Sequence, residues 1–129
     1  MNDIQATILT LLNSYGDIVE LEWDFDVDNI ITQLSGNNNW VTGPSISAPQ
    51  GLSLTGSDTL DLRVKDKKEG EYNSNLKSCP SLVEFFDKWN SLAKCHAVKM
   101  DAGTFFRPHR DAYKTTQQMR IFIPLNKTE

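Results

Sequence analysis

The sequence has no long apolar run, no excess of basic residues and no basic segment at its start. Its longest uninterrupted apolar runs are only a few residues, far short of the ~20 that a membrane-spanning helix needs, so we expect no membrane insertion. Lysine and arginine number 13 against 17 aspartate and glutamate residues. Because phosphate binding needs a basic stripe and these lysines are scattered, we also expect no nucleic-acid partner.

Cysteine is scarce as well. The two cysteines, Cys79 and Cys95, form neither a C-x-x-C pair nor a disulfide framework, so we expect both to be reduced and to act as small apolar residues. The first residues, MNDIQATILTLLNSYG, lack the basic region that opens a signal peptide. Together these features predict a cytoplasmic protein.

What the chain does have is the composition of an ordinary globular domain, with 39% hydrophobic and 23% charged residues. It contains no internal repeat and no low-complexity tract. Its 129 residues suit one domain, residues 1–129, that buries enough apolar surface to be stable without disulfides or a structural metal.

The first part of the chain predicts two helices and a strand. Apolar residues at helical spacing, followed by Gly16, indicate a helix over residues 4–15. Alternating apolar and acidic residues predict a strand over residues 18–23 with one solvent-exposed face. A short helix follows, capped by Asp28, ended by Gly36, and with three residues facing inward: Ile30, Ile31 and Leu34.

The central part, residues 37–75, is rich in Gly, Asn, Ser, Pro and Asp and is interrupted by short apolar pieces at residues 40–41, 52–54 and 60–62. This pattern predicts short strands joined by turns. The charged stretch from Lys65 to Glu71 is expected to be a solvated loop.

A further helix is predicted after this region. Pro80 or Ser81 begins it, since proline suits the first helical position and Ser81 can form a capping box with Glu84. Its apolar side chains share one face, which we expect to pack into the core: Leu82, Phe85, Phe86, Trp89 and Leu92.

After this helix the pattern is that of β-structure. Residues 95–100 predict a strand, Gly103-Thr104 a turn, residues 105–106 the start of another strand, and residues 119–125 a final strand. Runs of helix followed by runs of strand indicate an α+β fold, with helices packed on a largely antiparallel sheet.

His109-Arg110-Asp111 is the first candidate for chemistry. On a strand, an imidazole and a carboxylate at positions i and i+2 point to the same face and can bind one metal ion. They form the beginning of the 2-His-1-carboxylate triad of non-haem Fe(II) oxygenases. The tripeptide occurs often by chance, however, and on it alone an ion pair in a surface loop is the better interpretation.

Arg120 is the second candidate. On the predicted strand it faces away from Met119 and Ile121 and shares its face with Phe122. A guanidinium on a sheet face suits a two-pronged grip on a carboxylate. The alternative, in which Arg120 extends into solvent at the edge of the sheet, is equally compatible with the pattern.

The stretch from Cys79 to Leu125 resembles the core of the aspartyl/asparaginyl β-hydroxylase-like branch of the 2-oxoglutarate-dependent Fe(II) dioxygenases, which includes the proline-hydroxylase-type members. The N-terminal part is similar more loosely, through Asp26-Val27-Asp28 and Trp40. The closer resemblance lies in an ordered series: Cys79-Pro80 before a helix, a strand ending in Met100, a turn at Gly103, Pro108-His109-x-Asp111, and Arg120-Ile121-x-Ile123-Pro124-Leu125.

The resemblance implies a double-stranded β-helix, the jelly roll of cupin-like proteins, in which His109 and Asp111 bind Fe(II) and Arg120 binds 2-oxoglutarate. Phe122 stands where the family has a histidine in the strand of that arginine. The implied reaction is hydroxylation of an amino acid, or of an Asp, Asn or Pro residue in a peptide. The carboxylate of Asp111 favours hydroxylation, because halogenating relatives replace it with a small residue.

The family's third metal ligand, a second histidine several strands after the first, has no counterpart after Asp111. The other histidine, His96, lies on the predicted strand beside Cys95, where a structural role is expected. We therefore expect an N-terminal portion of an oxygenase jelly roll, with C-terminal strands missing. Such a chain would form homo-oligomers through an exposed sheet edge and have little or no activity alone. The alternative is a non-catalytic cupin-like binding or assembly domain.

Overall fold

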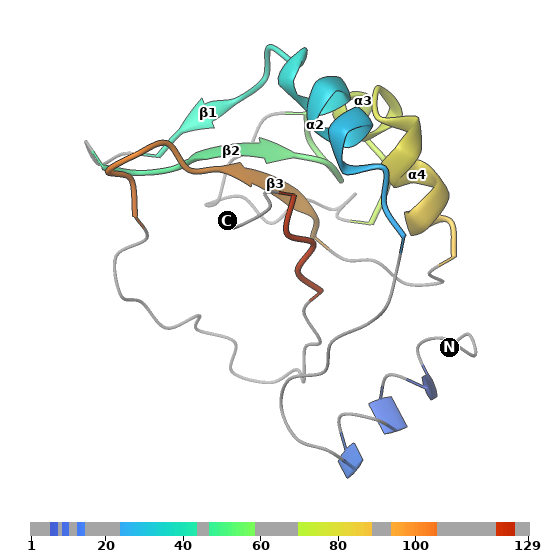
Figure 1. Ribbon diagram of the computed structural model, residues 1–129. Helices are drawn as coiled ribbons and strands as arrows, with labels where there is room; N and C mark the ends of the chain where they lie inside the picture. The colour runs from blue at the N-terminus through green and yellow to red at the C-terminus, as the bar shows by residue number, and fades with distance from the viewer. Residues whose placement is uncertain are drawn as a thin grey trace.

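The computed structural model describes residues 24–43, 47–58, 70–88, 94–105 and 121–125, together with six residues near the N-terminus. These parts form an α+β fold, in which the helices α2, α3 and α4 pack beside an antiparallel sheet of three strands in the order β1-β2-β3 (Figure 1). The predicted fold class is confirmed at this level. Because the described sheet is small and open, the jelly roll stays a prediction.

The six residues near the N-terminus are helical and exposed: Ala6, Thr7, Leu9, Thr10, Asn13 and Ser14. They alternate with the apolar positions of the helix predicted over residues 4–15, as expected for its solvent-exposed side. Those apolar positions, and the strand predicted over residues 18–23, lie outside the described residues. Within the described part of the chain, no helix has the length and apolar character needed to cross a membrane.

α2 spans Val27–Ser35, and its N-cap is Asp26 rather than the predicted Asp28. The Asp26 carboxylate accepts a hydrogen bond from the backbone N–H of Asn29 at 3.2 Å, which satisfies one of the unpaired amides of the first turn. Asp28 already lies inside that turn, where its negative charge suits the positive end of the helix dipole.

The buried face of α2 is narrower than predicted. Ile30 and Leu34 are buried, but Ile31 is 37% exposed, because it lies about 100° around the helix from Ile30. Gly36 is the C-cap, as predicted. Beyond it, Nε1 of the half-buried Trp40 donates to the carbonyl oxygen of Leu34 at 3.1 Å, so Trp40 ties the following loop to the end of the helix.

The sheet has β2 (Gln50–Ser53) at its centre, between β1 (Val41–Thr42) and β3 (His96–Lys99). β1 and β2 confirm two of the short strands predicted in the turn-rich region, with shifted bounds, and β3 confirms the strand predicted before the Gly103 turn. The register of β2 with β3 pairs Leu52 with Ala97. Leu52 is fully buried and Ala97 packs against the core, so this face of the sheet meets the core.

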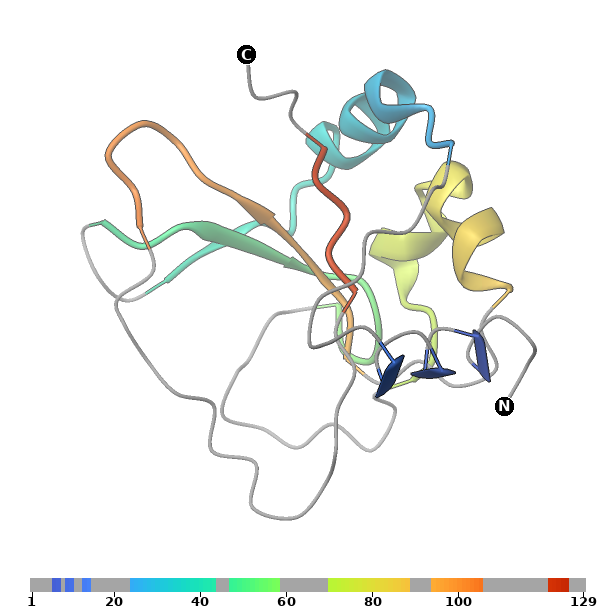
Figure 2. The same cartoon turned by 60° about the horizontal axis from the view of Figure 1, so that its bottom comes forward.

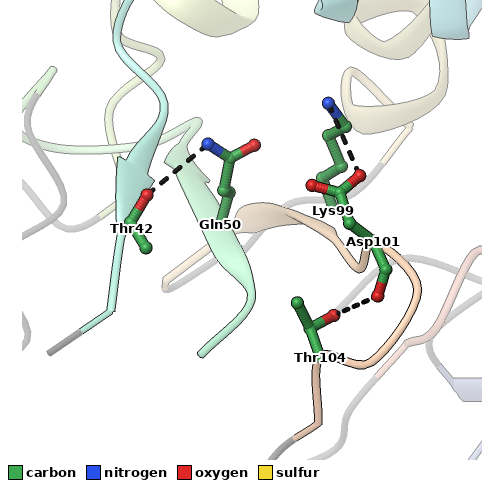
Figure 3. A network of polar contacts seen from close by, with 5 residues as sticks. All are labelled: Thr42, Gln50, Lys99, Asp101 and Thr104. Carbon is green, nitrogen blue, oxygen red and sulfur yellow. Dashed lines mark hydrogen bonds and ion pairs between the residues drawn. The ribbon is translucent and has the colours of Figure 1, made fainter. Parts of the chain in front are cut away.

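The chain turns after β3 at Gly103, as predicted. Gly103 has a φ of +84°, a conformation that favours glycine. Figure 3 shows the polar contacts of this turn: Oγ1 of Thr104 donates to the carbonyl oxygen of Asp101 at 2.7 Å, and Nζ of Lys99 lies 3.8 Å from the Asp101 carboxylate. The ion pair is exposed and therefore contributes little to stability.

α3 (Ser74–Lys77) is a single turn that the sequence does not predict. It is capped by Asn73, whose Oδ1 accepts a hydrogen bond from the backbone N–H of Leu76 at 3.1 Å. The local composition indicates only a turn, and the cap and the burial of Leu76 together convert that turn into a short helix.

α4 spans Pro80–Phe86, with proline at its first position, as predicted. The predicted capping box of Ser81 and Glu84 is wrong, because Ser81 already lies inside the helix and Cys79 occupies the N-cap position. Ser81 instead ties α4 to α2, since its hydroxyl oxygen accepts a hydrogen bond from Nδ2 of Asn29 at 3.1 Å.

The core lies between the sheet and the helices. The ring of Phe85 at its centre packs against Phe25, with 5.1 Å between the ring centroids, a normal spacing for an aromatic pair. Trp89 and Leu92, which we predict to extend the apolar face of α4, lie outside the described residues. The buried residues of the core are Ile30, Leu34, Leu52, Leu54, Leu76, Cys79, Leu82, Phe85 and Phe86.

The segment from Ile121 to Leu125 (red in Figure 2) has no regular secondary structure, so the strand predicted there is wrong for these residues. The predicted alternation of side chains is nevertheless present. Ile121, Ile123 and Leu125 pack against the core, while Phe122 is 82% exposed. The alternation in the sequence predicts which side chains are buried. A segment can bury alternate side chains without pairing with another strand.

A buried asparagine connects the sheet to the helices. Asn75 is 1% exposed, and its amide makes four hydrogen bonds. Nδ2 donates to the carbonyl oxygens of Ser53 at 2.8 Å and Asp58 at 2.9 Å. Oδ1 accepts from Nδ2 of Asn37 at 3.0 Å and of Asn39 at 2.7 Å. The amide is fully satisfied, which removes the cost of burying it.

Replacing this amide tests its role in the fold. We expect Asn75→Ala to lower the free energy of unfolding by about 2–4 kcal/mol, because it leaves buried polar groups unpaired and opens a cavity. Asn38→Ala in the adjacent loop is the matched control and should change stability by less than about 0.5 kcal/mol. Urea unfolding followed by tryptophan fluorescence measures both. A loss below about 1 kcal/mol for Asn75→Ala would contradict the structural role.

Candidate functional site

The predicted metal ligands His109 and Asp111 and the predicted cosubstrate ligand Arg120 lie outside the described residues. The structure does describe the chain on both sides of them. Phe105 has no regular secondary structure, contrary to the predicted strand start, but its backbone N–H donates to the carbonyl oxygen of Ser47 at 2.9 Å. On the other side, Ile121 packs against the core. In the sequence, all three predicted site residues therefore lie between Phe105 and Ile121, and both of these residues contact the described fold.

His96 is the other imidazole of the chain. It lies on β3 opposite Ser53 and is exposed, whereas the neighbouring Cys95 is half-buried and packs against the core. Among the residues that the structure describes, no three His, Cys, Asp or Glu side chains lie close enough together to hold a metal ion. The described part of the chain thus provides no complete metal site.

The predicted site contains donor atoms of the kinds that bind Fe(II) in a facial triad. An imidazole nitrogen and a carboxylate oxygen are two of the three protein donors of a facial triad. His109 and Asp111 therefore fit two positions of such a site.

The two cysteines are free thiols, as predicted. Burial raises the pKa of Cys95 to about 12. Burial also raises the pKa of Cys79, an effect that the backbone N–H of Leu82 opposes. Because the thiolate is the reactive and metal-binding form, neither thiol is suited to act as a nucleophile or a metal ligand at neutral pH. Both belong to the core rather than to a site.

Tyr72 and Asp87 form a polar contact at the end of α4. Burial raises the pKa of Tyr72 to about 12, and a hydrogen bond to the Asp87 carboxylate adds to the shift. Tyr72 also pairs with Thr55 in an isolated β-bridge and packs on the ring of Phe86. The neutral phenol at physiological pH thus links α4 to the end of β2 and has no acid–base role.

A polar hollow lies where the end of α2 meets α3. It has a volume of about 440 Å³ and is open to solvent. The run of asparagines at residues 37–39 is typical of a turn in the sequence, and in the fold all three asparagines line the hollow. The lining residues carry amide, hydroxyl or no polar side chains: Gln33, Gly36, Asn37, Asn38, Asn39, Ser74, Asn75 and Ser78.

Comparisons of this chain with protein-family models, with curated proteins and with solved structures found no match.

The state of the thiols is open to a direct test. At about pH 8 we expect neither Cys79 nor Cys95 to react with a thiol reagent while the chain is folded, because burial keeps both protonated. In denaturant two thiols should react, and in Cys95→Ser one. Rapid reaction of either thiol in the folded chain would contradict the assignment to the core.

The same burial gives a pH dependence of stability. The pKa of Cys95 is higher in the folded chain than in the unfolded chain. Its contribution to stability is therefore complete below the unfolded pKa and is lost as pH rises through about 12.

Proposed function

We propose that this chain carries part of the site of a 2-oxoglutarate- and Fe(II)-dependent hydroxylase, in which His109 and Asp111 bind the metal and Arg120 binds the cosubstrate. The observation that carries the proposal is the ordered series of motifs from Cys79 to Leu125. Its flanking elements occur in the expected order, with Pro80 at the first position of α4, β3 before Met100, and a turn at Gly103.

The residue chemistry is consistent with that assignment. An imidazole and a carboxylate suit Fe(II), and a guanidinium grips a carboxylate with two parallel hydrogen bonds. When bound, Fe(II) and 2-oxoglutarate supply the activation of O₂. With both bound, one oxygen atom of O₂ would enter a C–H bond of the substrate and the other would enter succinate, formed as 2-oxoglutarate loses CO₂. We propose an amino acid, or an Asp, Asn or Pro residue in a peptide, as the substrate.

The proposal includes a jelly roll fold and a partner. The described sheet is antiparallel and ends at β1 and β3, so further strands, of this chain or of a second copy, have edges to which they can add. We place the protein in the cytoplasm, because free thiols such as the buried Cys79 persist in a reducing compartment.

A second candidate is a non-catalytic cupin-like binding or assembly domain. The observation that favours it is the incomplete donor set. His109 and Asp111 are two donors, whereas a facial triad has three protein donors. A domain of this kind would keep the fold without binding a metal.

Metal titration separates the two candidates. Mn(II) is a suitable probe for Fe(II), since it accepts the same oxygen and nitrogen donors. We expect the wild-type chain to bind one Mn(II), and His109→Ala and Asp111→Ala each to weaken binding at least about tenfold. Added 2-oxoglutarate should tighten binding in the wild type but not in Arg120→Ala, which lacks the carboxylate clamp. Equilibrium dialysis measures all of these affinities.

The matched control is His96→Ala, which removes the other histidine and should leave Mn(II) affinity unchanged. Absence of saturable binding in the wild-type chain would contradict the hydroxylase and favour the binding domain. Equal losses in His96→Ala and His109→Ala would contradict the assigned ligands.

A further inference from the structure

The polar hollow beside α2 differs from the chain as a whole in the chemistry of its side chains. Charged residues make up 23% of the sequence, yet none of the eight residues that line the hollow is ionisable. Its lining comes from the end of α2 and the loop that follows it, and from α3 and the residue that follows α3. The lining side chains therefore offer a charged ligand no ion pair.

Asn37 and Asn39, which line the hollow, are held in place by hydrogen bonds to the buried Asn75. The Oδ1 of the buried Asn75 accepts a hydrogen bond from Nδ2 of Asn37 at 3.0 Å and from Nδ2 of Asn39 at 2.7 Å. Within the loop, Oδ1 of Asn37 accepts from the backbone N–H of Asn39 at 2.8 Å. These amides are ordered before any ligand arrives, so binding would cost little further loss of side-chain freedom.

The held amides keep unused hydrogen-bonding capacity. Each Nδ2 carries two hydrogens, and Asn37 and Asn39 each use one toward Asn75. In the described part of the chain, the side chain of Asn38 and the hydroxyl of Ser74 make no hydrogen bond to protein atoms. The hollow thus presents neutral groups that donate and accept, next to one another and open to solvent.

We propose that this hollow is a binding site for a neutral polyhydroxyl ligand of the sugar type. Each hydroxyl group of such a ligand both donates and accepts, which matches amides and hydroxyls that do the same. The site is open to solvent and its lining is mainly polar, so the affinity is weak, with a Kd on the order of 1 mM. It does not depend on the proposed hydroxylase function and does not involve its residues.

A titration followed by amide NMR tests the proposal on the full chain. D-glucose is the probe, and D-glucuronate, which adds a carboxylate, is the charged comparator. We expect saturable shifts of the side-chain amides of Asn37, Asn38 and Asn39 with glucose, and weaker binding of glucuronate. Asn38→Ala and Ser74→Ala should each weaken glucose binding about threefold to tenfold, the effect of one hydrogen bond.

Thr104→Ala, at the exposed turn after β3, is the matched control and should leave the affinity unchanged. Within the described part of the chain, neither the Asn38 side chain nor the Ser74 hydroxyl holds another element by a hydrogen bond, so both variants should fold normally, which the backbone spectrum verifies. Shifts that do not saturate, or equal affinities for the wild type, Asn38→Ala and Ser74→Ala, would overturn the proposal. Loss of Mn(II) binding in His109→Ala has no bearing on this outcome, which keeps the two proposals separable.

Discussion

The side-chain amide of Asn75 joins parts of the chain that no strand or helix connects. Through four hydrogen bonds it holds β2 at Ser53, the segment at Asp58, and the loop of Asn37 and Asn39. The elements of secondary structure in this region are short, since β1 has two residues and α3 is a single turn. A fully satisfied buried amide supplies the directional contacts that fix the loops between such short elements.

This arrangement determines what the fold can position. The central strand β2 pairs with β1 on one side and with β3 on the other. Asn75 donates a hydrogen bond to Ser53, the last residue of β2, and the chain continues from β3 through the Gly103 turn to Phe105. The return of the chain at Ile121 is fixed by apolar packing. The predicted ligands His109, Asp111 and Arg120 lie between these two anchors, so the described fold constrains where their segment starts and ends, and their chemistry rests on the sequence motifs.

The sequence predicted those features that depend on side-chain periodicity or on a single residue type. Pro80 marks the start of α4, Gly36 ends α2, and the alternation from Ile121 to Leu125 identifies the side chains that pack inward. It failed where several residues satisfy the same rule. Asp26 and Asp28 both suit an N-cap, and only the fold decides between them.

The same limit applies to the sites. The asparagines at residues 37, 39 and 75 appear in the sequence as turn-forming residues, because the bonds that unite them join positions far apart in the chain. Conversely, the dyad of His109 and Asp111 is visible only in the sequence, since the structure does not describe it. The dyad of His109 and Asp111 is thus predicted from the order of residues in the sequence, and the polar hollow from the positions of its residues in the fold.

Metal coordination by His109 is the basis of the proposed function, and NMR of the Co(II)-loaded chain tests it most directly. A paramagnetic ion shifts the imidazole protons of a coordinated histidine far outside the normal range. The account predicts one set of shifted imidazole resonances that disappears in His109→Ala and persists in His96→Ala. Absence of shifted imidazole resonances, or their loss in His96→Ala, would contradict it.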